Sequence, residues 1–139
     1  MGGSIWIILI AVIGAVVLMR LSSRIFSGTG GAGAGINEID ATEAARMISE
    51  QNAIVVDVRT ETEYAAGRIP DSLHVSLRQL PDRIDRLERY KDRPIVVNCR
   101  TGRRSASACA YLAQNGFEEV YNLKGGIRAW AHAKQSIVN

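Results

Sequence analysis

A short apolar run that leads through a cysteine-containing loop into a helical pattern constrains the fold of this chain more than any other feature. The run is Ile95-Val96-Val97-Asn98, and residues 105–115 have the composition of a helix. Between them lies Cys99-Arg100-Thr101-Gly102-Arg103-Arg104-Ser105, which we call the cysteine loop. A β-branched run of this kind is typical of a strand covered on both faces, and strands followed by helices are the units of α/β folds.

The alternation of strand and helix patterns extends over residues 36–139. Residues 53–58 form a second β-branched run, and weaker strand patterns follow at 73–76 and 119–123. Helices are predicted from Asp40, which can cap its first turn, over 61–66, and from Pro81. Strands separated by helices predict an α/β fold, with a central parallel sheet of about five strands and helices on both faces.

The helix predicted from Pro81 has a core side and a charged side. Ile84 and Leu87 are expected to face inward. On the surface, the i,i+4 pairs Asp82/Arg86 and Asp85/Arg89 are expected to form ion pairs.

Cys99 is the candidate nucleophile. It follows a predicted strand, and sites in open α/β sheets form beyond the carboxyl ends of the strands. The N-terminus of the helix predicted from Ser105, the three arginines of the loop, and Gly102, which lets successive N–H groups converge, all favour a thiolate. The sequence therefore predicts a lowered pKa for Cys99 and an anion-binding cradle around it.

Four segments, taken in order, resemble the rhodanese family of sulfurtransferases. They are Val56-Asp57-Val58-Arg59 with Glu63-Tyr64, then 67–72, the cysteine loop, and 123–130. The second segment departs from the family's Gly-His-Ile-Pro-Gly-Ala pattern at Arg68, Asp71 and Ser72. The resemblance runs from about Ile36 to Trp130 and implies a single rhodanese-like domain.

The resemblance also implies a reaction. The Cys99 thiolate would take the outer sulfur of thiosulfate, or of a persulfide donor, and become a persulfide. Cyanide or a thiol would then accept that sulfur. The backbone N–H groups of residues 100–104 would stabilise the persulfide, and the implied substrate-binding residues are Arg100, Thr101, Gly102, Arg103 and Arg104. The resemblance implies neither a cofactor nor a metal ion.

Other polar residues near the predicted site are candidates for supporting roles. Ser105 ends the cysteine loop, and Asp57 and Arg59 end the strand at 53–58. Asp57 and Arg59 either brace the loop or form an internal salt bridge that holds turns together. For Cys109, a small apolar residue packed inside its helix is favoured over a second reactive thiol.

Two other functions compete with sulfur transfer. In the related phosphatases and arsenate reductases that this loop also resembles, the pattern is Cys-x5-Arg, with an arginine six residues after the cysteine. Here the sixth residue after Cys99 is Ser105, and Arg104 is the fifth. The shorter loop suits a sulfane sulfur better than a tetrahedral oxyanion. A persulfide carrier or recruiting module that docks to a membrane partner is the second alternative, and the retained Cys99 argues against a purely binding role.

The N-terminal segment predicts a single membrane anchor. Residues 1–19 carry no charge, and a helix of that length spans about 28 Å, close to the hydrocarbon core of a bilayer. Arg20 and Arg24 follow the apolar run, which is the reverse of a signal peptide. We expect residues 5–21 to cross a bacterial inner membrane once, with the N-terminus outside and the domain in the cytoplasm.

The remaining sequence completes the domain plan and excludes some functions. The plan is an anchor with a basic juxtamembrane segment over 1–26, a glycine-rich linker over 27–35, and the rhodanese-like domain over 36–139. Beyond the two juxtamembrane arginines, 15 Lys and Arg face 14 Asp and Glu, so nucleic-acid binding is not indicated. Two cysteines do not make a disulfide framework, and the His and Cys residues lack zinc-ligand spacing.

Overall fold

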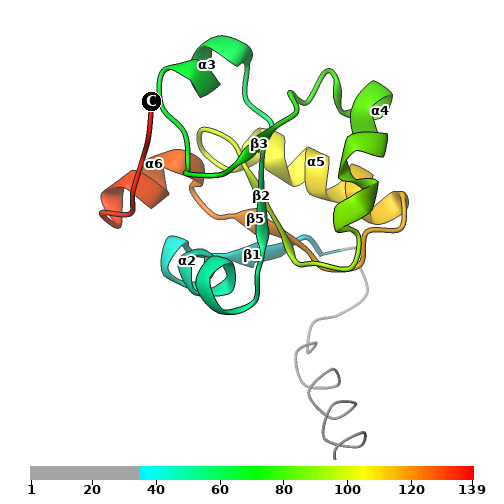
Figure 1. Ribbon diagram of the computed structural model, residues 1–139, viewed down its shortest axis with the longest axis horizontal. Helices are drawn as coiled ribbons and strands as arrows, with labels where there is room; N and C mark the ends of the chain where they lie inside the picture. The colour runs from blue at the N-terminus through cyan, green and yellow to red at the C-terminus, as the bar shows by residue number, and fades with distance from the viewer. Residues whose placement is uncertain (1–34) are drawn as a thin grey trace, which may run out of the picture. The chain divides into compact units, whose positions relative to one another are not determined.

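The computed structural model describes residues 35–139, and the predicted membrane anchor with most of the predicted linker lies outside these residues (Figure 1). The strands are β1 (Asn37–Ile39), β2 (Ile54–Asp57), β3 (Leu73–His74), β4 (Ile95–Asn98) and β5 (Val120–Leu123). The helices are α2 (Ala41–Glu50), α3 (Glu61–Ala65), α4 (Leu80–Arg83), the 3-10 helix η1 (Ile84–Tyr90), α5 (Arg103–Gln114) and α6 (Gly126–His132). Between residues 35 and 139, no helix has the length and apolarity needed to cross a membrane.

The five strands form one parallel sheet in the order β1-β5-β4-β2-β3, as predicted for an α/β fold. From β2 the chain moves outward to β3, whereas from β4 it moves outward to β5. The strand order therefore reverses between β2 and β4. In open α/β sheets, the crevice at such a reversal is where ligands bind, beyond the carboxyl ends of the two strands.

Helices cover both faces of the sheet, which confirms the predicted layering (Figure 1). Val56 and Val97 pack with residues of α4, η1 and α5 on one face, whereas Val55 and Val96 pack with α2 and α6 on the other. Adjacent side chains of a strand point to opposite faces, so a strand covered on both sides needs apolar residues throughout. This requirement explains the uninterrupted β-branched runs.

The segment after Pro81 differs from its prediction. A four-residue α-helix, α4, is followed by the 3-10 helix η1 rather than by one continuous α-helix. In a 3-10 helix, residues three apart lie on the same side. Ile84, Leu87 and Tyr90 accordingly pack against one core cluster. Residues four apart no longer align, and neither predicted pair, Asp82/Arg86 or Asp85/Arg89, is among the ion pairs of the described residues.

Helix α5 begins two residues earlier than predicted, so Arg103 and Arg104 belong to its first turn and not to the loop. Gly102 is the N-cap residue and has a left-handed backbone with φ 97°. Its carbonyl already accepts the first helical hydrogen bond, from the Ala106 N–H at 3.3 Å. Because glycine adopts this conformation without strain, the helix can begin directly after it. The backbone amides of Thr101, Gly102 and Ser105 consequently lie close to Cys99, and Ser105 is in the first turn of α5.

Candidate active site

Cys99 lies directly after β4, at the point where the strand order reverses. Its side chain is only 1 % exposed. The neighbouring carboxyl end of β2 supplies Asp57 and Arg59, and the register places Asp57 opposite Asn98. The structure therefore brings the predicted nucleophile and two of its predicted supporting residues to one edge of the sheet.

The cysteine loop curls around the Cys99 sulfur. The Gly102 N–H donates to Sγ at 3.1 Å, and the Ser105 Oγ lies 3.2 Å from Sγ. Burial by itself would raise the pKa of the thiol. Hydrogen bonds from the Ser105 hydroxyl and from the backbone N–H groups of Ser105, Thr101 and Gly102 outweigh it, so the pKa of Cys99 is lowered. The thiolate is stabilised by a nest of donors, as in other reactive cysteines.

The first turn of helix α6 holds this loop in place through backbone hydrogen bonds. The Ile127 N–H donates to the Cys99 carbonyl at 2.8 Å, and the Arg128 N–H donates to the Arg100 carbonyl at 3.4 Å. With these carbonyls turned toward α6, the amides that follow them are free to face the sulfur. Gly126 makes the close approach possible, because a Cβ there would lie 2.3 Å from the Cys99 carbonyl oxygen.

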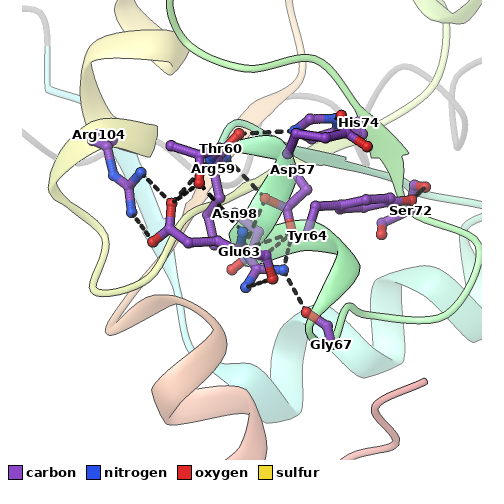
Figure 2. Close-up of polar contacts among 11 residues, drawn as sticks. Asp57, Arg59, Thr60, Glu63, Tyr64, Gly67, Ser72, His74, Asn98 and Arg104 are labelled. Atoms are coloured by element: carbon purple, nitrogen blue, oxygen red, sulfur yellow. Dashed lines mark hydrogen bonds and ion pairs between the residues drawn. The ribbon is translucent and has the colours of Figure 1, made fainter. Parts of the chain in front are cut away.

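The three arginines of the sequence motif are not equivalent. Arg100 and Arg103 are exposed, as is Thr101. Within residues 35–139, no ion pair involves Arg100 or Arg103. Arg104 instead donates to both carboxylate oxygens of Glu63, each at 2.8 Å (Figure 2). Of the three arginines, Arg100 and Arg103 are therefore the ones whose charge remains available to an incoming anion.

Asp57 and Arg59 form a buried ion pair that ties several turns together (Figure 2). The Arg59 guanidinium donates to Asp57 at 2.8 Å and to the carbonyls of Glu63 and Gly67 at 3.1 and 2.7 Å. The Asn98 amide donates to the same carboxylate at 3.0 Å. Of the two roles predicted for this pair, the internal salt bridge is therefore present, and the pair is hydrogen-bonded to Asn98, the residue immediately before Cys99.

Replacing Asp57 by alanine is expected to lower the free energy of unfolding by about 3–5 kcal/mol, because Arg59 would remain buried without its counter-ion. Urea unfolding of the variant and the wild type measures this difference. Glu43→Ala is the control, since it breaks the exposed Arg46–Glu43 pair of α2 and should cost much less. Equal losses in the two variants would contradict the proposed importance of the buried pair.

The Arg104–Glu63 pair predicts that the stability of the fold depends on pH in the acidic range. Its hydrogen bonds lower the pKa of Glu63 to about 2, although partial burial opposes the shift. Because this folded-state pKa lies below the unfolded value of about 4.3, the stabilisation is complete above that value and is lost as the pH falls toward 2. The melting temperature of Glu63→Gln should therefore fall less than that of the wild type between about pH 5 and pH 2.5. An identical acid dependence in both proteins would refute this contribution.

Several residues of the site were not predicted from the sequence. Asn122, at 2 % exposure, has its Oδ1 2.6 Å from the Ser105 Oγ. Glu63 holds Arg104 across 41 positions of sequence. Ile127 and Gly126 support the loop from α6. The sequence signals for these roles are weak, because each depends on a long-range contact.

The second cysteine is part of the core. Cys109 is buried in the cluster beneath α5, and burial raises its pKa to about 12. Its thiol therefore stays protonated at neutral pH, in agreement with the apolar role predicted for it. Over residues 35–139, no three His, Cys, Asp or Glu side chains gather closely enough to hold a metal ion.

Comparison with known proteins agrees with this geometry. Residues 40–133 match the model of the rhodanese-like domain. The chain belongs to the rhodanese-like family. This rhodanese-like protein is 42 % identical over 104 residues to a sulfurtransferase of Allochromatium vinosum, a match that covers 74 % of this chain and 95 % of the relative.

Two further rhodanese-like relatives extend the comparison. The thiosulfate sulfurtransferase GlpE of Stutzerimonas stutzeri is 40 % identical over 96 residues, covering 69 % of this chain and 86 % of the relative. The crystal structure of a rhodanese-related protein from Thermoplasma volcanium superposes with a TM-score of 0.67 at 29 % identity, covering 73 % of this chain and 97 % of that one. Both the predicted family and the predicted fold are thereby confirmed.

Proposed function

We propose that this protein is a thiosulfate sulfurtransferase that carries a sulfane sulfur as a persulfide on Cys99. The observation that supports the mechanism most strongly is the convergence of the Gly102 N–H and the Ser105 hydroxyl on a buried Sγ with a lowered pKa. The rhodanese-like family and the sulfurtransferases among its relatives support the general reaction.

The first half-reaction transfers sulfur to the enzyme. The exposed Arg100 and Arg103 attract the thiosulfate dianion toward the loop. The Cys99 thiolate attacks the outer sulfur and forms a new S–S bond, while the bond to the inner sulfur breaks and sulfite leaves with its electron pair. The amides that held the thiolate then stabilise the terminal sulfur of the persulfide.

The second half-reaction passes the sulfur on. A nucleophile, either cyanide or a thiolate, attacks the terminal sulfur of the persulfide, and the S–S bond to Cys99 breaks. Thiocyanate or a new persulfide leaves, and Cys99 returns to the thiolate. No proton has to reach the leaving cysteine sulfur, because the donors of the loop stabilise its negative charge.

Phosphate chemistry fits this loop less well. A Cys-x5-Arg loop would have its arginine at position 105, where Ser105 is fully buried and lies 3.2 Å from Sγ. Arg104 does not replace that arginine, because Glu63 holds its guanidinium in a two-point ion pair. The residues present therefore favour transfer of a sulfur atom over binding of a phosphate.

The thiosulfate:cyanide assay on the purified full-length protein tests this function. We expect thiocyanate formation that saturates with thiosulfate, and no hydrolysis of p-nitrophenyl phosphate under the same conditions. Phosphate-ester hydrolysis without any thiocyanate would overturn the proposal.

The N-terminal residues support a further part of the proposal, a single-pass anchor over residues 5–21 that holds the domain on the cytoplasmic side of the membrane. The uncharged run 1–19 followed by Arg20 and Arg24 is its basis. There the enzyme would exchange sulfur with a small anionic donor and a thiol acceptor, or with a protein partner at the membrane. Protease should remove the domain from inside-out vesicles and spare it in right-side-out ones, and recovery of the protein without membranes would contradict the anchor.

A further inference from the structure

The Ser105 hydroxyl has one proton and two acceptors within reach. Its Oγ lies 3.2 Å from the Cys99 sulfur and 2.6 Å from the Asn122 Oδ1. Ser105 and Asn122 are both buried, at 0 % and 2 % exposure. Because a hydroxyl donates only one hydrogen bond, it serves either the sulfur or the amide oxygen.

The orientation of the Asn122 side chain follows from its other contacts. Its Nδ2 donates to the Gly102 carbonyl at 3.1 Å and lies 3.3 Å from the Glu38 carboxylate of β1. Rotating the amide by half a turn would place Oδ1 against these two acceptors. The amide oxygen is therefore held toward Ser105, where it accepts from the hydroxyl.

We propose that Asn122 is a positioning residue that sets the balance between thiol and thiolate at Cys99 through the Ser105 hydroxyl. In the thiol form, the S–H donates to Ser105 Oγ, and the hydroxyl donates to Asn122 Oδ1. When the S–H proton leaves to solvent, the hydroxyl turns to the thiolate and leaves the buried Oδ1 without a donor. An unpaired buried acceptor is unfavourable, so Asn122 opposes ionisation while Ser105 promotes it.

The same balance bears on sulfur transfer, and in this respect the inference rests on the proposed function. A nucleophile that is kept partly protonated is less open to irreversible oxidation between turnovers. Once sulfur is bound, the terminal sulfur of the persulfide competes with Asn122 for the same proton.

Charged residues lie on the elements around this site, and none of them is substituted in the variants used below, although Asn122→Leu removes the contact between the Asn122 Nδ2 and the Glu38 carboxylate. These charged residues are Asp57 at the end of β2 and its partner Arg59, Glu63 of α3, Arg100 after β4, Arg103 and Arg104 of α5, Glu38 of β1, and Arg128 of α6. A shift caused by Asn122 therefore acts through the Ser105 hydroxyl, through Glu38 or through a change of structure, and only the first of these routes requires Ser105.

A double-mutant cycle on the full-length protein separates the route through the hydroxyl from the other two. The pKa of Cys99 is measured from the pH dependence of iodoacetamide alkylation, followed on the Cys99 peptide by mass spectrometry. Asn122→Leu should lower this pKa by about half to one unit, and Ser105→Ala should raise it by a similar amount. In the Ser105→Ala background, Asn122→Leu should produce no shift, because the hydroxyl through which it acts is absent.

The leucine variant leaves the Gly102 carbonyl with its hydrogen bond from the Ala106 N–H. Asn122→Ala is measured in parallel. Each variant that still unfolds cooperatively, and is therefore folded, must show a lowered Cys99 pKa. An unchanged or raised pKa, or a shift that persists without the Ser105 hydroxyl, would overturn the proposal.

One readout needs no substitution at Asn122. The side-chain amide resonance of Asn122 should titrate with the Cys99 pKa in the wild type and lose most of that change in Ser105→Ala. If the Asn122 resonance changed equally with pH in both proteins, the change would reflect the thiolate charge alone. That result would refute the proposed transfer of the Ser105 hydrogen bond from Asn122 to the thiolate. Alkylation requires no thiosulfate, so a failure of sulfur transfer with these shifts intact would count against the proposed function and not against this inference.

Discussion

Replacing Cys99 by serine is expected to reduce thiocyanate formation from thiosulfate and cyanide by at least about a thousandfold. The hydroxyl of serine is a far weaker nucleophile than the thiolate that the loop stabilises, and it cannot form a persulfide. The initial rate of thiocyanate production at saturating thiosulfate measures the loss.

Cys109→Ala is the matched control for this substitution. Cys109 is buried in the core and its pKa is raised to about 12, so its removal should affect stability and leave the rate within a few-fold of the wild type. Comparable losses in the two variants, or a Cys99→Ser protein that retains activity, would show that sulfur does not pass through Cys99.

Replacing Gly126 by alanine should be almost as damaging, although the residue touches no substrate. Its φ is +60°, and an added Cβ would lie 2.3 Å from the Cys99 carbonyl oxygen and 2.6 Å from the Arg100 carbonyl. All of these are backbone atoms, so the loop itself must move. We expect a loss of about 2–5 kcal/mol in the free energy of unfolding. Activity should fall at least about a hundredfold in the fraction that remains folded.

Gly116→Ala separates backbone strain from this clash. Gly116 also has a positive φ, of 85°, but a Cβ there would meet only the flexible end of Lys91 at 3.8 Å. This variant should lose about 1 kcal/mol of stability and keep its activity. If Gly126→Ala behaved like Gly116→Ala, the account of how α6 supports the cysteine loop would be wrong.

Much of the fold could be predicted because local patterns and tertiary environment agree. The β-branched runs became β2 and β4, which are covered on both faces, and Asp40 caps α2 by accepting from the Glu43 N–H at 2.8 Å. Elements that depend on distant partners were missed. β1 has only three residues and forms a strand because it pairs with the edge of β5. The two glycines at the start of α6 are typical of a turn, so the sequence did not predict this helix.

The candidate site was predictable to a similar extent and for the same reason. Cys99 and its amide nest follow from a strand, a glycine and a helix that are adjacent in sequence. The partners of that nest lie elsewhere: Glu63 comes from α3, Asn122 from β5, and Ile127 from α6. The sequence motif counts Arg104 as a positive charge that is free to attract an anion. In the structure Glu63, which is distant in sequence, neutralises that charge.

The central claim is that sulfur rests on Cys99 between donor and acceptor. Mass spectrometry of the full-length protein after treatment with thiosulfate tests it most directly. We predict the gain of one sulfur atom on the peptide that contains Cys99, its removal by cyanide, and no gain in Cys99→Ser. Thiocyanate production without any sulfur on Cys99, or with the sulfur on Cys109, would contradict the mechanism.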